Sequence, residues 1–167
     1  MNGTIPAVIL LYGIAGSGKS FAGRALAEGL GYHHYELDQD LTSAMRLAIA
    51  ENRSFTEVMR DEFFEIVVQR MLEVVRHYPR TVFTQGVYKE RHRAFLQDRV
   101  PGLKVIWITA PSGSVLDRLR RRGDSVSAEY AALIERNFET PREGLVLSND
   151  DCSPTECCAR FLHLFRA

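Results

Sequence analysis

Residues 4–20 read TIPAVILLYGIAGSGKS, and this stretch decides the expected fold. Its first half, from Thr4 to Tyr12, is a nearly continuous apolar run, which is typical of a strand buried on both faces of a parallel sheet. A glycine-rich turn follows, and from Lys19 to Leu30 the apolar residues recur at helical spacing. The order strand, turn, helix predicts a loop that can hold an anion at a helix N-terminus.

The turn itself, GIAGSGKS at residues 13–20, fits G-x-x-x-x-G-K-[ST] at every fixed position. Its glycines permit backbone conformations that point amide N–H groups at phosphate oxygens. Lys19 would reach the β- and γ-phosphates, and the Ser20 hydroxyl would bind Mg²⁺. We therefore expect ATP and Mg²⁺ at this loop. The expected nucleotide contacts are Gly13, Ala15, Gly16, Ser17, Gly18, Lys19, Ser20 and Phe21.

Strands and helices alternate along the rest of the chain. Further strands are predicted at 33–37, 80–84, 103–109 and 144–147. Helices are predicted at 40–51, 56–78, 88–98, 111–122, 127–138 and 153–165. The alternation predicts an α/β fold of three layers, a five-stranded parallel sheet with helices on both faces. Because no repeat or long linker interrupts the pattern, residues 1–167 are expected to form a single domain.

Composition and charge narrow the class of protein. The 167 residues are 46% hydrophobic, enough for a core, and 21 Lys plus Arg balance 21 Asp plus Glu. A net charge of zero offers no global field to attract nucleic acid or an anionic membrane. The longest apolar run, Ala7 to Tyr12, is too short to span a bilayer. The three cysteines lack C-x-x-C spacing, so we expect reduced thiols in a cytoplasmic protein of unspecified oligomeric state.

Acidic residues follow the second predicted strand rather than the third. The third strand ends in Gln85 and Gly86, where a motor or switch ATPase usually has a metal-binding carboxylate. Asp38 and Asp40 instead follow the second strand, at the carboxyl edge where parallel sheets bind ligands. The alternative for this pair is a polar turn that ends in an N-cap for the next helix.

GIAGSGKS, LDQD at residues 37–40 and MRDE at residues 59–62 together resemble the small P-loop kinases related to shikimate kinase and gluconate kinase. The resemblance spans most of the chain and implies ATP-dependent phosphoryl transfer to a hydroxyl of a small metabolite. It implies that Asp38 lies near the metal ion and that Asp40 is the catalytic residue facing the acceptor hydroxyl. It further implies that Arg60 holds an anionic group of the acceptor.

The second half of the chain also resembles this family. The helix that ends RLRRRGD resembles the one that leads into an arginine-bearing lid, here at about 118–128, next to a substrate-binding segment at about 40–78. Arg120 or Arg122 is then expected to reach ATP as a catalytic arginine. Arg136 matches more weakly the arginine that precedes the final strand and binds substrate. The FETP sequence at residues 138–141 is similar to the gluconate kinase ending.

The sequence departs from the shikimate kinase pattern after the third strand. Three consecutive glycines meet the acceptor there in shikimate kinases, whereas this chain has Gln85, Gly86 and Val87. The departure argues against shikimate itself as the acceptor. Because the Gln85 amide can both donate and accept hydrogen bonds, a polyol or sugar acid would suit this position.

Two alternatives to a small-molecule kinase follow from the same residues. The arginines at 118–122 form either a solvated helix end or a grip on a nucleic acid backbone, as in a nucleotide or polynucleotide 5′-hydroxyl kinase. The neutral net charge weighs against the nucleic acid. From a different class, the chain would be a nucleotide-binding regulatory protein that has no acceptor.

Overall fold

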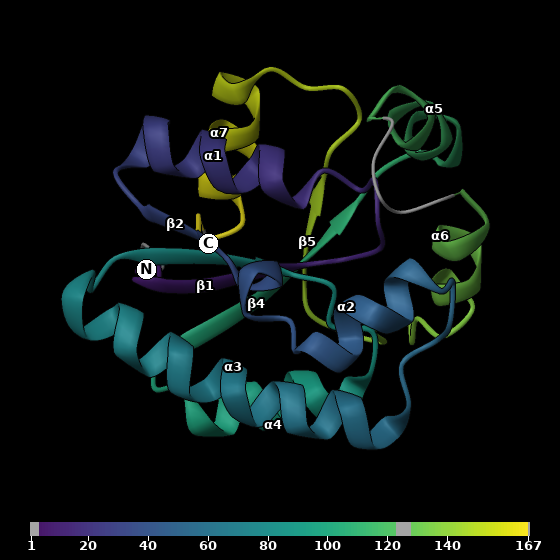
Figure 1. Ribbon diagram of the computed structural model, residues 1–167. Coiled ribbons are helices and arrows are strands. Elements are labelled where there is room, and N and C mark those ends of the chain that lie inside the picture. Colours follow the sequence, from purple (N-terminus) through teal and green to yellow (C-terminus); the bar gives the residue numbers. More distant parts are fainter. Residues whose placement is uncertain (1–3, 123–127, 167) are drawn as a thin grey trace.

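A computed structural model describes residues 4–122 and 128–166, in which strands and helices alternate as expected (Figure 1). The strands are β1 (Val8–Tyr12), β2 (His33–Glu36), β3 (Thr81–Gln85), β4 (Leu103–Thr109) and β5 (Leu145–Ser148). The helices are α1 (Lys19–Leu30), α2 (Ser43–Ala50), α3 (Glu57–His77), α4 (Glu90–Arg99), α5 (Ser112–Arg122), α6 (Ala128–Glu135) and α7 (Pro154–His163). A 3₁₀ turn at Leu37–Asp40 follows β2.

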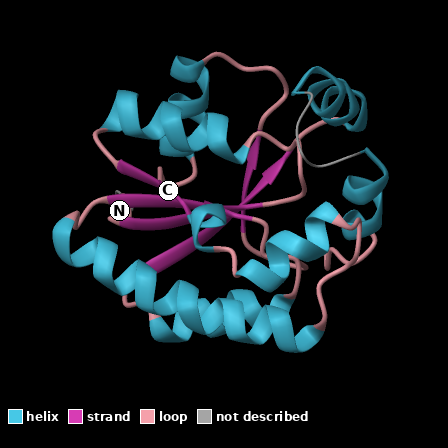
Figure 2. Cartoon of the chain, viewed as in Figure 1, coloured by secondary structure: helices cyan, strands magenta, loops and turns pink. Residues whose placement is uncertain are grey.

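The strands form one parallel sheet in the order β2-β3-β1-β4-β5. β1 lies at its centre, with Leu10 beside Phe83 of β3 and Val105 of β4. All five residues of β1 are buried, as its apolar run predicts. Figure 2 shows the strands between two layers of helices, which confirms the expected three-layer α/β fold.

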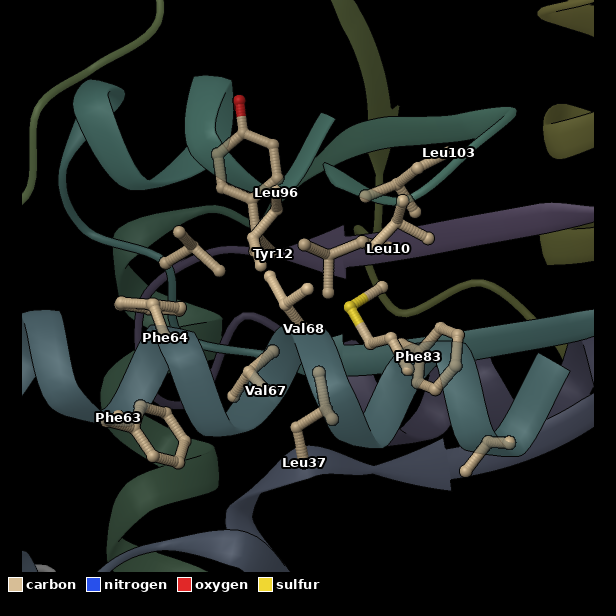
Figure 3. Packing of buried hydrophobic residues seen from close by; sticks show 14 of the residues in the cluster. Leu10, Tyr12, Leu37, Phe63, Phe64, Val67, Val68, Phe83, Leu96 and Leu103 are labelled. Carbon is tan, nitrogen blue, oxygen red and sulfur yellow. The ribbon is translucent and has the colours of Figure 1, made fainter. Parts of the chain in front are cut away.

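Alternation along β1 divides the core between the two faces of the sheet. Leu10 and Tyr12 pack with residues of α3 and α4, whereas Ile9 and Leu11 pack with residues of α1 and α7. Figure 3 shows the first of these clusters, where side chains of α3 meet Leu10 and Phe83. The two clusters hold the carboxyl ends of the strands at one edge, where the loop at residues 13–20 begins.

The segment after β2 differs from its prediction. The sequence predicts a helix from residue 40, but α2 begins at Ser43 because the Thr42 hydroxyl accepts a hydrogen bond from the Met45 amide. The residues before it form the 3₁₀ turn instead, which ends at Asp40. A turn of this kind rotates successive side chains by about 120° per residue, so it changes where each carboxylate of the LDQD sequence points.

Part of the expected lid lies outside the described residues. Residues 123–127 and the side chains of Arg120 and Arg122 belong to this part, although α5 itself is described up to Arg122. In the ranges 4–122 and 128–166, no helix combines the length and the apolar character that crossing a membrane would need.

Candidate active site

The glycine-rich loop has the backbone conformation that its sequence predicts. Gly16 and Gly18 adopt φ values of 79° and 95°, in the left-handed region that favours glycine. A Cβ atom at residue 18 would lie only 1.7 Å from Nδ2 of Asn149, so a larger residue there would displace a neighbour of the loop. The close packing explains why glycine is needed at this position.

The N-terminus of α1 has no side-chain cap. The hydroxyls of Thr42 and Thr56 accept hydrogen bonds at the starts of α2 and α3, but Gly18 at the start of α1 provides no such group. No acidic residue lies in the first turn of α1. The first amides of this helix and its dipole therefore suit an anion supplied by a ligand.

Two residues distant in sequence brace the loop from outside. Arg118 of α5 donates hydrogen bonds to the carbonyls of Gly16 and Ser17, at 3.2 and 3.3 Å, and forms an ion pair with Asp151 at 2.8 Å. Asn149, after β5, donates from Nδ2 to the Ser17 carbonyl at 3.1 Å. The sequence analysis placed Arg118 only within a basic cluster and assigned no side-chain role to Asn149. The helical spacing of Arg118 from buried Val115, both facing the loop, is the signal that could have found it.

Ser17 supplies a direct test of whether this loop fits phosphate groups. Its side chain is 1% exposed, and among the described residues its Oγ has no hydrogen-bond partner. Buried hydroxyls normally have a hydrogen-bond partner. A buried hydroxyl without one, inside a glycine-rich loop, therefore fits a site that a ligand completes. Together with the uncapped N-terminus of α1, this atom supports the expected nucleotide site.

A pocket of about 520 Å³ lies beside the loop and collects most of the expected acceptor residues. Residues that the sequence predicted to act on nucleotide or acceptor line it, namely Ala15, Lys19, Asp38, Arg60, Gln85 and Gly86. They come from the loop, the 3₁₀ turn, α3 and the end of β3, segments far apart in sequence. Lys19 reaches back along its own loop, with Nζ donating to the Ile14 carbonyl at 2.9 Å.

Asp38 is open to the pocket, yet protein atoms surround its carboxylate. This partial desolvation raises the pKa of Asp38, while the positive charge of Lys19 and the amide of Gln85 counter part of the rise. Gln85 is buried and its Oε1 accepts from the Gly86 amide at 2.6 Å. Its Nε2 is buried and, by strict geometry, has no hydrogen-bond partner among the described residues, although the amide lies close enough to the Asp38 carboxylate to lower its pKa.

Asp40, which the family resemblance places at the acceptor, lies outside the lining of this pocket. Its carboxylate forms an ion pair with Arg70 of α3 at 2.9 Å and accepts a hydrogen bond from the Tyr35 hydroxyl at 2.9 Å. It does not line the pocket. On a strand, residues two apart share a face, but in the 3₁₀ turn they lie about 120° apart around the axis. The turn therefore directs Asp38, not Asp40, toward Lys19.

A network of charges surrounds Arg60 at the pocket. Its side chain is 10% exposed, and one of its terminal nitrogens, NH1, pairs with Glu57 at 2.8 Å. Arg91 of α4 bridges Glu57 and Asp61, at 2.5 and 2.6 Å. His92, which also lines the pocket, contacts Asp61 through Nε2 at 2.8 Å, and burial lowers the pKa of its imidazole. Arg91 and His92 belong to the charged sequence YKERHR at residues 88–93. Only the fold shows that they lie beside α3.

Arg136 is the one described acceptor residue besides Asp40 that the pocket does not include. It is exposed just after α6, away from the pocket lining. The buried arginine nearby is Arg93, which is 1% exposed and donates to the carbonyls of Val87 and Glu139 at 2.8 and 2.7 Å. Arg93 thus ties the segment that carries the FETP sequence to the end of β3.

The glycine-rich loop, the sheet order and the pocket beside Lys19 together define a P-loop kinase fold. The model of the shikimate kinase family matches residues 15–150, and the chain belongs to this family. This membership confirms the resemblance noted in the sequence.

Curated relatives share part of their length with this chain. A shikimate kinase of Rhizobium leguminosarum is 28% identical over 116 residues, which cover 68% of this chain and 57% of the relative. A shikimate kinase of Gloeobacter violaceus is 34% identical over 116 residues, which cover 66% of this chain and 60% of the relative. The chain therefore spans less than two thirds of the length of these relatives.

Solved structures resemble the whole fold. A sugar kinase from a Janibacter species has a TM-score of 0.81 at 17% identity, covering 95% of this chain and 94% of that chain. A gluconokinase from Sinorhizobium meliloti has a TM-score of 0.77 at 20% identity, covering 96% and 92%. At these identities the likeness establishes the fold, and the acceptor must be argued from the pocket.

Proposed function

We propose that this protein is an ATP-dependent kinase that transfers a phosphoryl group to a hydroxyl of a small, anionic metabolite. The observation that carries the proposal is the shared pocket, which is lined by the loop lysine Lys19, by Asp38 and by Arg60. Phosphoryl transfer requires these three functions in one place: charge neutralisation, a proton acceptor and an anchor for the acceptor.

In the proposed reaction, the acceptor hydroxyl attacks the γ-phosphorus of ATP and its proton passes to Asp38. A bond forms between the hydroxyl oxygen and phosphorus, the bond from phosphorus to the β–γ bridging oxygen breaks, and ADP leaves. The raised pKa of Asp38 makes its carboxylate a stronger proton acceptor than an ordinary aspartate. Asp38 thus takes the role that the family resemblance assigned to Asp40.

The loop and α1 hold the nucleotide in this proposal. Backbone amides from Gly13 to Ser20 bind the phosphates, and Lys19 neutralises charge on the transferring group. Mg²⁺, when bound with ATP, supplies further positive charge at the phosphates, and we assign the Ser20 hydroxyl to it. Mg²⁺ usually keeps several waters and phosphate oxygens as ligands. The described residues include no group of three or more metal-binding side chains, and none is needed for a metal that arrives with nucleotide.

The remaining assignments concern the borders of the site. The pocket wall supplied by residues 41–64 supports the role of residues 40–78 as a substrate-binding segment. We retain the lid at about 118–128, with Arg120 or Arg122 closing on ATP, as a proposal that rests on the family resemblance. The three free, buried cysteines support a reducing, cytoplasmic compartment.

Acceptor-dependent ADP formation tests the proposed function. Purified protein with MgATP should form ADP faster when hydroxylated anions are added, and mass spectrometry should detect the phosphate ester. Tight nucleotide binding with no stimulation by any acceptor would instead favour a regulatory nucleotide-binding protein. Stimulation by nucleosides or by 5′-hydroxyl oligonucleotides would favour the nucleotide or polynucleotide kinase.

Lys19→Met provides the decisive variant for this activity. Since the Lys19 ammonium stabilises charge that develops during transfer, its loss should lower kcat by at least about a hundredfold, or roughly 2.7 kcal/mol. Lys104→Met removes an exposed lysine from β4 and should leave kcat unchanged. A folded Lys19→Met protein with normal turnover would exclude the glycine-rich loop as the site of transfer.

A further inference from the structure

The acceptor pocket has a wall that continues the hydrophobic core. Met45, Phe63 and Phe64 line the pocket and also belong to the core cluster beneath α3. Figure 3 shows both phenylalanines at the end of that cluster, on the N-terminal part of α3. Leu41 and Phe55 are half-buried, pack against the same cluster and line the pocket too. The hydrophobic core is therefore continuous with one wall of the pocket.

This wall offers no side-chain hydrogen bonds over a wide stretch. Ile49 and Ala50 of α2 extend it with further apolar surface. A molecule with a hydroxyl on every carbon would bury several of them here against groups that cannot pair with them, and unpaired buried hydroxyls are costly. A molecule with an apolar body would instead remove more apolar surface from water.

The polar side chains of the pocket are few and already hold neighbours. Arg46 donates to the carbonyls of Gln39 and Leu41, at 2.8 and 3.2 Å, and His92 contacts Asp61. Arg60 pairs with Glu57 through one terminal nitrogen. Because a guanidinium has five N–H donors, the remaining N–H groups of Arg60 can still bind a carboxylate in the pocket. Asp38 and Gln85 line the pocket at the strand ends, beside the loop, where a reacting hydroxyl would lie.

We propose that the acceptor is a hydroxy acid with an apolar aliphatic or aromatic body rather than a polyol or sugar acid. The inference rests on the proposed kinase function. The carboxylate binds Arg60, the single reacting hydroxyl lies between Asp38 and the loop, and the body packs on Met45, Ile49 and Phe55. The hydroxyl proton goes to Asp38 as its oxygen bonds to the γ-phosphorus, and the bond to the leaving ADP breaks.

A matched acceptor panel tests this assignment. 3-Phenyllactate carries one hydroxyl, one carboxylate and an aromatic body, whereas gluconate and shikimate carry the carboxylate with several hydroxyls. We expect kcat/KM for 3-phenyllactate or an aliphatic 2-hydroxy acid to exceed that for both polyols by at least tenfold. A preference for gluconate or shikimate would overturn the inference while leaving the kinase function standing.

Ile49→Asn, compared with Leu47→Asn, tests the wall itself. Both residues lie on α2, but Ile49 lines the pocket and Leu47 is 54% exposed outside it. Ile49→Asn should raise KM for the apolar hydroxy acid at least tenfold and leave KM for ATP within about twofold, whereas Leu47→Asn should change neither. Equal effects of the two variants would overturn the inference.

Direct binding separates this inference from the proposed function and from a folding defect. Tryptophan fluorescence or calorimetry with 3-phenyllactate and the wild-type protein needs neither turnover nor a variant. Binding without phosphorylation of any acceptor would refute the kinase function but support the apolar pocket. Absence of binding, alongside binding of gluconate or turnover with it, would refute the apolar pocket alone.

Discussion

At the scale of single residues, Asp38 and Asp40 have different surroundings although they are two positions apart. Asp38 is open to the pocket, near Lys19, and its pKa is raised mainly by desolvation. The Asp40 side chain is 9% exposed and pairs with Arg70 and Tyr35. The first environment favours proton transfer, and the second favours stability, so the two carboxylates should respond differently to the same substitution.

Asp38→Asn should strongly reduce activity without loss of stability. The folded pKa lies above the unfolded value, so at neutral pH the ionised carboxylate weakens the fold, and replacing it by a neutral amide should leave Tm equal or higher. Loss of the general base should lower kcat by about 10²- to 10⁴-fold. Asp40→Asn is the control: kcat should stay within about threefold, and weakening of its ion pair by about 1 kcal/mol should lower Tm by about 2–4 °C. The reverse pattern would restore Asp40 as the base.

Arg60→Lys should affect the acceptor and not the nucleotide. A lysine keeps the charge but cannot form two parallel hydrogen bonds to a carboxylate, so the acceptor KM should rise about tenfold, or near 1.4 kcal/mol, with the ATP KM within about twofold. Arg91→Lys is the matched control, because Arg91 also pairs with Glu57 but does not line the pocket. If both variants have equal KM values for the acceptor, Arg60 is a structural member of the ion-pair network only.

At the scale of elements, α4 connects the acceptor pocket to the segment after α6. The guanidinium of Arg93 lies over the rings of Tyr12 and Phe138, at 4.9 and 5.7 Å from their centroids, and donates to the carbonyls of Val87 and Glu139. The same helix contributes His92 to the pocket. Arg93 therefore fixes the helix that shapes one side of the site.

Arg93→Leu should destabilise the fold strongly. It removes the donors of two backbone carbonyls, together with an ion pair to Glu90, in a place where the arginine is 1% exposed. We expect the free energy of unfolding to fall by about 3 kcal/mol in urea denaturation. Arg99→Leu, at the exposed end of the same helix, should change it by less than about 0.5 kcal/mol. Equal losses for the two variants would contradict a structural role of Arg93.

At the scale of the whole molecule, α7 joins the nucleotide loop to the core on the α1 face. Cys157 and Cys158 of α7 and Cys152 before it are all buried in that cluster. The Cys152 thiol lies 3.7 Å from Oδ1 of Asn149, the residue that braces the loop. Unfolding of the region around these cysteines and loss of the nucleotide site should therefore occur together.

Thiol labelling should report that event. Burial raises the pKa of Cys157 to about 12, and since only the thiolate reacts, Ellman's reagent should modify the native protein at pH 8 no faster than the protein unfolds. MgATP at 100 times its Kd should slow labelling by about a hundredfold, because it binds the folded state alone. In guanidinium chloride all three thiols should react at once. Rapid labelling in native buffer would contradict coupling of the cysteines to global opening.

Several features of this protein are determined by local sequence. The glycines and lysine of residues 13–20 predicted the anion loop, because positive φ angles and helix N-termini are properties of short segments. The nearly continuous apolar run from Thr4 to Tyr12 predicted a strand buried on both faces of a parallel sheet, and β1 is such a strand. The alternation of strands and helices predicted the parallel sheet, since each connection must cross one face. These predictions are confirmed because they depend on neighbours within a few residues.

Other features were decided by the tertiary structure alone. Asp38 faces the pocket and Asp40 faces Arg70 because a short 3₁₀ turn, set by what packs on it, replaces the predicted start of a helix. Arg118 reaches the loop from about a hundred residues away, and His92 meets Asp61 across two helices. Such contacts join segments that no local pattern pairs, because the energy of packing depends on which surfaces meet rather than on spacing along the chain.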